Sequence, residues 1–527
     1  MGRKRIPEQK KLSAAIQVLH HVSGSGSDVI KGTQLKQTER EILLKNGFLQ
    51  EIIKGWYFVT EPSALPADEA PYLVHYWEYV SCYLGKRFGD HYCLNPEHSL
   101  LMHAQSNRIP RQINVMTRQR ATQKIELSDG HALLIYPTNT LPDPSLRQTL
   151  LGIQCLAAPA CLVLLAPRFF RTHASDIQIV MSKISDPADI ADLVEYNALG
   201  VGRLIGAYRQ TSRLTFADDI LKQLEGSFIK VPVVDSPFDQ QPNCQLSTNN
   251  QQSLYARVKL LWYKHRDSVL ACKPQITTLK GAQERYLEAL ETLRADDAYH
   301  GLTIERYQVT PALIQDVADG LWSPDPSKST RHNDTMAAIT GYLRVFNLVK
   351  KDIEQVYAYE RATADLFIDH EQSWFRQLCA PFVDAGLLTP EELNDYRRHR
   401  VILRGSKHSP PHVDQIASGM TALKECLSEE VDPFVRATLG HWLLSYIQPY
   451  ANGTGWLARF TMNLMLAEGG YPWTIIQSSE RDAYLQALEL ACTQDKLEPF
   501  ARFLANQIEH ATQINEHHTA KSVIYVE

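Results

Sequence analysis

The feature that most constrains the fold is a long succession of apolar residues at helical spacing in the second half of the chain. From Leu254 onward, apolar side chains recur every three or four residues in one segment after another. This spacing places them on one face of an α-helix. We expect helices at 254–270, 279–294, 311–321, 334–369, 372–386, 415–428, 435–447, 455–467 and 480–492. We find no internal repeat, and the pattern predicts an all-α C-terminal bundle.

The first half of the chain has a different pattern, which predicts mixed helices and strands. Residues 8–60 contain helical spacing, a second helix that ends near Asn46-Gly47, and two short β-runs around Lys54-Gly55, which is a hairpin signal. Helices followed by a hairpin within so few residues predict a winged helix. The runs "INVMT", "QKIEL", "ALLIYPT" and "CLVLLA" then read as strands of a small α/β module.

A chain of 527 residues is too long for one hydrophobic core, so we expect several domains. The fold class is multidomain α/β plus all-α. The polar, Gln- and Asn-rich stretch at 234–253 has no periodicity and reads as a linker or exposed loop. The predicted divisions are a winged helix at 1–65, an α/β module with a helical extension at 66–233, that linker, a helical region at 254–370, a helical core at 371–512 and a tail at 513–527.

Charge is distributed unevenly along the chain. Residues 1–60 hold ten Lys and Arg against five Asp and Glu, whereas the whole chain has a net charge of −5, so the remainder is about −10. A basic end on an acidic body favours DNA as a partner. We expect Lys31, Lys36, Arg40 and Lys54 on the face toward the phosphates. The alternative is a small α/β domain with a hairpin that binds no DNA.

Cysteine usage and hydropathy bear on the compartment. The nine cysteines are scattered and form no CxxC pair, which is typical of reduced thiols in a cytosolic protein. The first twelve residues are too polar for a signal peptide. The apolar segment "LLGIQCLAAPACLVLLAP", 150–167, is interrupted by Gln154 and two prolines, so we read it as a buried helix followed by a buried strand. We expect a cytoplasmic protein with no membrane partner.

The stretch "YIQPYANGTGWLARF", 446–460, has the pattern of an anion-binding loop between two helices. Pro449 stops the first helix, and Gly453 and Gly455 permit a tight turn with unhindered N–H groups. The next helix begins near Trp456, so its positive end faces the loop. Arg459 lies about one turn inside that helix, within reach of a phosphate.

Here the sequence resembles the Fic (Fido) family, whose pattern is HPFxDGNGRxxR in a loop between two helices. The segments "ALGHWLLSYIQPY" and "ARFTMNLMLAEGGYPW" are similar to the flanking helices of the family, and the resemblance extends over roughly 290–510. "ILRGSKHSPP", 402–411, is similar to the family's flap, an edge strand that aligns the target peptide. The flap residues implied are Gly405, Ser406, Lys407 and His408.

The resemblance implies transfer of AMP from ATP to a protein hydroxyl, with a His as base, an acidic residue on Mg²⁺, and an Asn and two Arg on the phosphates. This chain has Gln448 in the His place, and a neutral amide cannot take a proton at neutral pH. Asn452 replaces the carboxylate, Thr454 the Asn and Trp456 the first Arg. We therefore expect neither ordinary AMP transfer nor Mg²⁺ held in the family manner.

What remains could still hold a nucleotide, ATP or another, through Asn452, Gly453, Thr454, Gly455 and Arg459. A further match is "YHGLTIERYQVT", 299–310, which is similar to the inhibitory helix of one subset of the family. It puts Glu305 in the inhibitory place. We therefore predict an ion pair between Glu305 and Arg459. The alternative for Glu305 is a solvated helix face.

Other histidines are weak substitutes for the missing base. His441 lies two helical turns before Gln448, roughly 10 Å along the axis, and we read it as a packed structural residue. His408 and His412 belong to the flap-like segment, and we read them as exposed loop histidines; the alternative is that they approach a bound ligand.

The N-terminal part resembles the winged-helix antitoxins of type IV abortive-infection pairs, in "KGWYFV", "NPEHSLLMHA" and "IPRQINVMT". Three functions stay open. The first is a DNA-binding regulator whose Fic-like part senses a nucleotide or partner, or forms a homodimer. The second is a transferase with a non-standard mechanism. The third is an antitoxin-like interaction protein with a protein partner.

Overall fold

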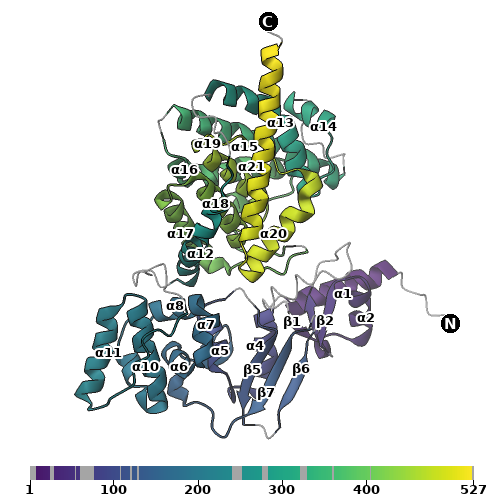
Figure 1. The fold of residues 1–527 in the computed structure, drawn as a ribbon. Coiled ribbons are helices and arrows are strands. Elements are labelled where there is room, and N and C mark those ends of the chain that lie inside the picture. Colours follow the sequence, from purple (N-terminus) through teal and green to yellow (C-terminus); the bar gives the residue numbers. More distant parts are fainter. Residues whose placement is uncertain are drawn as a thin grey trace, which may run out of the picture. The chain divides into compact units, whose positions relative to one another are not determined.

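The protein is described by a computed structural model that covers residues 8–23, 29–53, 55–59, 76–106, 109–118, 121–127, 130–239, 252–275, 283–320, 329–358, 361–403 and 405–524. The chain divides into two compact units (Figure 1). Unit 1 comprises Met1–Ser253 and Ile402–Ser409, and unit 2 comprises Leu254–Val401 and Pro410–Glu527.

Unit 1 begins with helices packed on a small sheet. The elements are α1 (Glu8–Ser23), β1 (Val29–Lys31), the 3₁₀ helix η1 (Gly32–Gln34), α2 (Gln37–Lys45), β2 (Leu49–Ile53) and β3 (Trp56–Val59). The strands are antiparallel in the order β1-β3-β2. Leu19, Ile30, Leu43 and Tyr57 are buried between helices and sheet. The two helices and the hairpin strands expected at 8–60 are present, and Lys54 lies outside the described residues.

A second sheet follows at the expected strands. Its elements are α4 (Tyr76–Phe88), β4 (Tyr92–Leu94), α5 (Pro96–His103), β5 (Gln112–Thr117), β6 (Gln123–Glu126) and β7 (Ala132–Pro137). The strand order is β4-β5-β7-β6, with β5 and β7 parallel and the outer pairs antiparallel. The runs "INVMT", "QKIEL" and "ALLIYPT" thus form three neighbouring strands of one mixed sheet.

The apolar segment at 150–167 was expected as a helix followed by a strand, and this order is wrong. A hairpin of β8 (Arg147–Leu150) and β9 (Ile153–Leu156) comes first, and "CLVLLA" lies in and just after α6 (Ala158–Leu164). Pro159 stands in the first turn of α6, where its missing N–H has no helical partner to lose. A fully buried apolar run has no periodicity that separates helix from strand. Within the described parts of the chain, no helix combines the length and hydropathy that a bilayer span requires.

Five helices, α7 (Pro167–Thr172), α8 (Ala174–Ser182), α9 (Ala188–Ala191), α10 (Val194–Gln210) and α11 (Leu214–Gly226), extend unit 1. The chain after α11 then packs on α10, where Gln210 exchanges two hydrogen bonds of 3.0 Å with the backbone of Phe238. Phe238 is buried. The linker expected from residue 234 therefore begins later, because the chain through residue 239 is part of the domain; 240–251 lie outside the described residues.

Unit 2 is a helical bundle around one large core. Its helices are α12 (Ser253–Leu270), α13 (Gln283–Ile304), α14 (Pro311–Ala318), α15 (Thr330–Tyr357), α16 (Thr363–Asp384), α17 (Ile416–Glu429), α18 (Pro433–Ile447), α19 (Thr454–Glu468), α20 (Arg481–Gln494) and α21 (Glu498–Ile524). The most extensive contacts join α18 to α19 and α15 to α16. The multidomain α/β plus all-α fold class is confirmed.

Three details of the second half of the chain differ from expectation. The single helix expected at 334–369 is two helices, because α15 ends at Tyr357 and α16 begins at Thr363. The predicted tail at 513–527 is helical as far as Ile524. The flap-like segment contains no strand at 402–403 or 405–411, the residues of it that the structure describes, and 402–409 belong to unit 1.

Candidate functional site

The loop between α18 and α19 starts at Gln448, which has a left-handed backbone with φ of 49°. Its backbone N–H donates to Leu444 O at 2.9 Å, and its side-chain Nε2 donates to Ser445 O at 2.9 Å. The amide therefore turns back and caps the last turn of α18. A His in this place would have to point outward to act as a base, whereas Gln448 satisfies a helix carbonyl.

Tyr450 anchors the middle of the loop. Its ring stacks on Phe375 with 3.8 Å between the ring centroids, and its hydroxyl donates to the buried carboxylate of Glu371. Tyr396 also donates to Glu371, at 2.8 Å, and the Lys424 ammonium lies 3.1 Å from it. The Tyr450 hydroxyl thus joins a satisfied buried hydrogen-bond network around Glu371.

Arg397 holds the start of the loop, and sequence reasoning missed it. Its Nε donates to Gln448 O at 2.7 Å, its backbone N–H donates to Pro449 O at 2.8 Å, and Nη2 donates to Pro411 O at 2.7 Å. Burial lowers the pKa of Arg397 to about 10. A local pattern gives no signal for these contacts, because they join residues far apart in the sequence.

The turn into α19 requires glycine at 453. Gly453 has φ of +79°, and a Cβ there would lie 2.6 Å from Leu378 Cδ2. Thr454 is buried, and its hydroxyl donates to Tyr450 O at 3.2 Å. Asn452 is exposed. Of the predicted nucleotide-binding side chains, Thr454 is thus engaged within the loop, while Asn452 stays accessible to solvent.

A carboxylate of the protein itself lies at the N-terminus of α19. Glu305 Oε1 is 2.5 Å from the position that a Cβ of Gly455 would take, and 3.0 Å from Arg459 Nη2. The predicted Glu305–Arg459 ion pair is therefore present. Burial opposes the charge of Arg459, but the Glu305 carboxylate outweighs it and raises the arginine's pKa. Both the helix end and Arg459 thus meet an internal anion.

Trp456 joins the last turn of α13 to the first turn of α19 through a hydrogen bond. Its indole Nε1 donates to Gly301 O at 3.1 Å, and Arg459 Nη2 donates to the same oxygen at 3.2 Å. Gly301 is required there, because a Cβ would lie 2.7 Å from two ring atoms of Tyr342. Trp456, which stands in the place of the family's first Arg, and Gly301 therefore belong to one contact that holds Glu305 in position.

The three histidines considered as substitutes for the missing base, His408, His412 and His441, have other surroundings in the structure. His441 is fully buried, its Nε2 is 2.8 Å from the Tyr484 hydroxyl, and burial together with the Arg459 charge lowers its pKa to about 3. His412 Nδ1 lies 3.1 Å from the Asp414 carboxylate. His408 is only 5% exposed, so the expectation of an exposed loop histidine is wrong for this residue. It lies in the segment 402–409, which belongs to unit 1 together with Gly405, Ser406 and Lys407.

Of the candidate DNA contacts, Lys31 and Lys36 are exposed. Arg40 instead has a structural role: Nη1 donates to Gly32 O at 3.0 Å, and the guanidinium lies over the Tyr57 ring at 5.8 Å. Lys54 lies outside the described residues. The described residues contain no group of three or more His, Cys, Asp or Glu side chains arranged to hold a metal ion.

A cavity of about 280 Å³ opens beside the loop, within unit 2. Its lining residues come from the loop, from the end of α13 and from α15 and α16: Glu305, Tyr307, Asp334, Cys379, Phe382, Leu387, Leu388, Asn452, Gly453, Gly455 and Trp456. Sequence reasoning named only its loop side and Glu305. The residues of the opposite wall follow no spacing that could have marked them.

Comparison with known protein families relates the helical part that carries this loop to one family of domains. Residues 373–466 match the profile of the Fic/DOC family. The chain thus carries a Fic domain in its C-terminal part.

The curated relatives include the protein adenylyltransferase Fic of Drosophila virilis, 27% identical over 271 residues, which are 50% of this chain and 50% of the relative. The Drosophila melanogaster protein of that name is 28% identical over 214 residues, covering 40% of this chain and 39% of the relative. This chain therefore spans half or less of the length of these curated relatives.

Among solved structures, Fic-1 from C. elegans has a TM-score of 0.34 and 16% identity, and covers 66% of this chain and 89% of its own. A Fic family protein from Desulfovibrio desulfuricans G20 has a TM-score of 0.36 and 17% identity, and covers 53% of this chain and 78% of its own.

Proposed function

We propose that this is a Fic-domain protein that does not transfer AMP by the family's ordinary route. Its C-terminal part binds a nucleotide or a partner, and its N-terminal part contacts DNA as a regulator or antitoxin-like protein. The observation that carries the proposal is the state of Gln448. Its Nε2 donates to Ser445 O, and its remaining polar atom is an amide oxygen, which is too weak a base for the attacking hydroxyl.

The rest of the loop supports the same reading. Asn452, a neutral amide, takes the place of the carboxylate that would help to bind Mg²⁺. Trp456 takes the place of the first phosphate-binding Arg and is buried against the end of α13. General base catalysis alone is worth about 10²–10⁴-fold in rate. Because the anion site already holds Glu305, an incoming nucleotide must displace that carboxylate.

Labelled ATP with Mg²⁺ and a cell lysate tests the loss of transfer. We expect the wild-type protein to label no protein band. We expect a variant that restores the family pattern, Gln448→His with Asn452→Asp, Thr454→Asn, Trp456→Arg and Glu305→Gly, to gain labelling of about 10²-fold or more over background. Labelling by the wild-type protein that disappears in Arg459→Ala would contradict the proposal.

A second candidate function is an active transferase with a non-standard mechanism. It is favoured by the name of the Drosophila relatives, protein adenylyltransferase, and by the retained Gly453, Gly455 and Arg459. The same assay with labelled UTP, GTP and CTP separates the candidates. Bands that depend on Arg459 with any one nucleotide would support the transferase.

The DNA-binding part of the proposal rests on the N-terminal arrangement. A helix, a strand, α2 and a hairpin follow each other, with Lys31 and Lys36 exposed beside α2. We expect salt-sensitive binding of duplex DNA in a gel-shift assay. Changing both lysines to Ala should lower the slope of log K against log salt by about 2, because each phosphate contact contributes about 0.9. Lys124→Ala, on β6, is the matched control. An unchanged slope in the double variant would contradict these contacts.

A further inference from the structure

The cavity beside the loop has aromatic and aliphatic walls. Trp456 and Tyr307 lie with 5.6 Å between ring centroids, and Phe382, Leu387 and Leu388 complete the apolar lining. Cys379 also lines the cavity, and burial raises its thiol pKa to about 12, so it is neutral at physiological pH. With a liquid-water share of about 30 Å³ per molecule, the volume of about 280 Å³ suits a small organic molecule rather than a chain segment.

Two carboxylates also line the cavity, and they differ. Glu305 is paired with Arg459. Asp334, on α15, is half-buried, and its carboxylate makes no hydrogen bond or ion pair with any residue that the structure describes. Burial raises the pKa of Asp334, as expected for a carboxylate without a cationic neighbour. No Lys or Arg is present among the described lining residues. The cavity thus presents negative charge between aromatic rings.

We propose that this cavity binds a small alkylammonium ion, with Asp334 as its counter-charge and Trp456, Tyr307 and Phe382 as its aromatic walls. Aromatic faces attract cations through the ring quadrupole, and the attraction grows when water is excluded. A carboxylate beside such rings supplies the charge that a desolvated cation needs. An anionic group gains nothing from the wall on α15 and α16, because no Lys or Arg is among the described residues that line it.

The inference goes beyond the proposed function. Asn452, Gly453 and Gly455 of the predicted nucleotide site line one side of the cavity, whereas Asp334 and Phe382 line the other side, on α15 and α16. Glu305 lies at the border between the two sites. A ligand in the cavity would touch both the Glu305 carboxylate and Trp456, the residues that join the end of α13 to α19. A ligand bound in the cavity would therefore also affect binding at the anion site.

Calorimetric titration of the full-length protein with choline tests the site, with 3,3-dimethylbutan-1-ol as an uncharged probe of the same shape. We expect choline to bind with a Kd on the order of 1 mM or tighter, and the alcohol to bind at least about tenfold more weakly. Asp334→Asn should weaken choline binding by at least about tenfold and leave the alcohol unaffected.

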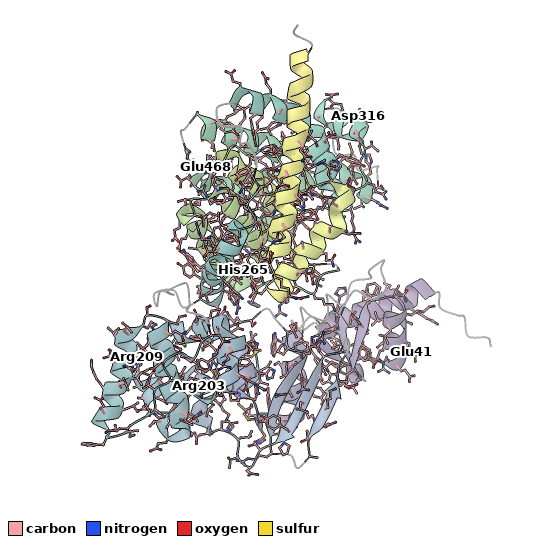
Figure 2. All side chains as sticks on the ribbon, viewed as in Figure 1. Glu41, Arg203, Arg209, His265, Asp316 and Glu468 are labelled. Carbon is pink, nitrogen blue, oxygen red and sulfur yellow. The ribbon has the colours of Figure 1, made fainter. Side chains whose placement is uncertain are left out.

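The matched control is Asp316→Asn on α14, an exposed acid that does not line the cavity (Figure 2). It should leave choline binding unchanged, and thermal melts should show that both variants fold. Equal affinity for the two probes would overturn the proposal. So would unchanged choline binding in Asp334→Asn, or the same loss in Asp316→Asn, or no choline binding with a Kd below about 10 mM.

Discussion

Glu305 places a carboxylate where an anionic ligand would meet the first turn of α19. The carboxylate touches Gly455, whose missing Cβ makes the approach possible, and it pairs with Arg459 at 3.0 Å. Arg459 Nε and Nη1 meet no hydrogen-bond acceptor among the described residues. Glu305 thus compensates the charge of a buried guanidinium, which would be costly to bury without an anionic partner.

A double-mutant cycle measures how strongly these residues depend on each other. We expect Glu305→Gln and Arg459→Met each to lower the free energy of unfolding, and the pair to show a coupling of about 1 kcal/mol. The value is modest because the Glu305 side chain keeps 39% of its surface exposed. Urea unfolding of the four proteins supplies the measurement. Purely additive effects would show that the observed ion pair contributes nothing, and a Glu489→Gln cycle with Arg459 serves as the uncoupled comparison.

For single residues, the sequence predicted the Glu305–Arg459 ion pair but not the contacts that surround it. The Glu305–Arg459 pair followed from two family motifs. That Trp456 donates to Gly301 O, and that Gly301 leaves room for Tyr342, did not follow. Both depend on where α13, α15 and α19 cross. Thr454 was expected to bind phosphate, yet its hydroxyl donates to Tyr450 O.

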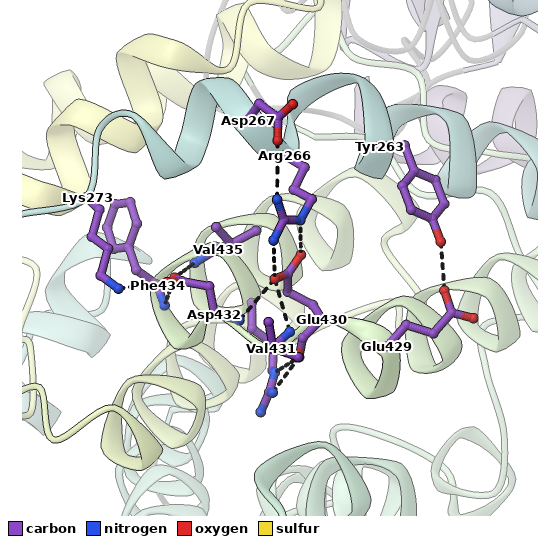
Figure 3. A network of polar contacts seen from close by, with 11 residues as sticks. Tyr263, Arg266, Asp267, Lys273, Glu429, Glu430, Val431, Asp432, Phe434 and Val435 are labelled. Carbon is purple, nitrogen blue, oxygen red and sulfur yellow. Dashed lines mark hydrogen bonds and ion pairs between the residues drawn. The ribbon is translucent and has the colours of Figure 1, made fainter. Parts of the chain in front are cut away.

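Among the elements, α12 is joined to the rest of unit 2 by a set of charged contacts (Figure 3). Arg266 on α12 forms a two-point ion pair with Glu430, with Nε–Oε2 2.7 Å and Nη2–Oε1 3.1 Å. The Glu430 side chain is 2% exposed and also accepts the backbone N–H groups of Val431 and Asp432 at 3.0 Å. A carboxylate that buried is stable only with such a full set of donors.

The same corner explains the start of α18. Asp432 caps it by accepting the N–H groups of Phe434 and Val435 at 3.0 and 3.1 Å, and Lys273 donates to Asp432 at 2.7 Å (Figure 3). Capping satisfies N–H groups that lack a partner inside the helix. Because α18 carries Gln448 at its other end, the corner helps to set where the loop begins. The helix was predictable from its apolar spacing, whereas this long-range docking of α12 was not.

For the whole molecule, the two units contain buried histidines that make stability depend on pH. Burial lowers the pKa of His98 in unit 1 to about 4, and that of His441 in unit 2 to about 3. The unfolded value is about 6.5. A depressed folded pKa means that this stability is complete above about pH 6.5 and falls as the pH is lowered, since only the unfolded chain then takes up the proton. Asp297 in unit 2 acts in the opposite sense, because burial raises its pKa to about 6.

The two units should therefore respond differently to acid. In unit 2 the stability that His441 loses between pH 6 and 4 is offset by the gain from Asp297, whereas His98 in unit 1 is not offset by these groups. We expect the strand pair β4–β5, next to His98, to lose up to about 1.4 kcal/mol of protection per pH unit below pH 6.5. Peptide-resolved hydrogen exchange at pH 7, 6 and 5, corrected for intrinsic rates, gives the measurement.

His98→Gln is the variant that separates this cause from others. It keeps a polar side chain beside Asn95, whose Oδ1 lies 2.6 Å from His98 Nδ1, but it cannot titrate. The pH slope at β4–β5 should then decrease. A wild-type protein with equal protection at pH 7 and pH 5, or a variant with the wild-type slope, would show that His98 does not govern the acid response.

The amino-acid sequence alone determined many local features of this protein: most helices of unit 2, the strands β5, β6 and β7, and the turn at Pro449, Gly453 and Gly455. Each depends on side-chain spacing or on the backbone freedom of one residue, and both are written in a short stretch of chain. The tertiary structure alone decided which residues contact the loop between α18 and α19. The Gln448 amide turned to Ser445, the carboxylate on Gly455, and the cavity around Asp334 all depend on how distant helices cross, because packing and burial, rather than local preference, set those contacts.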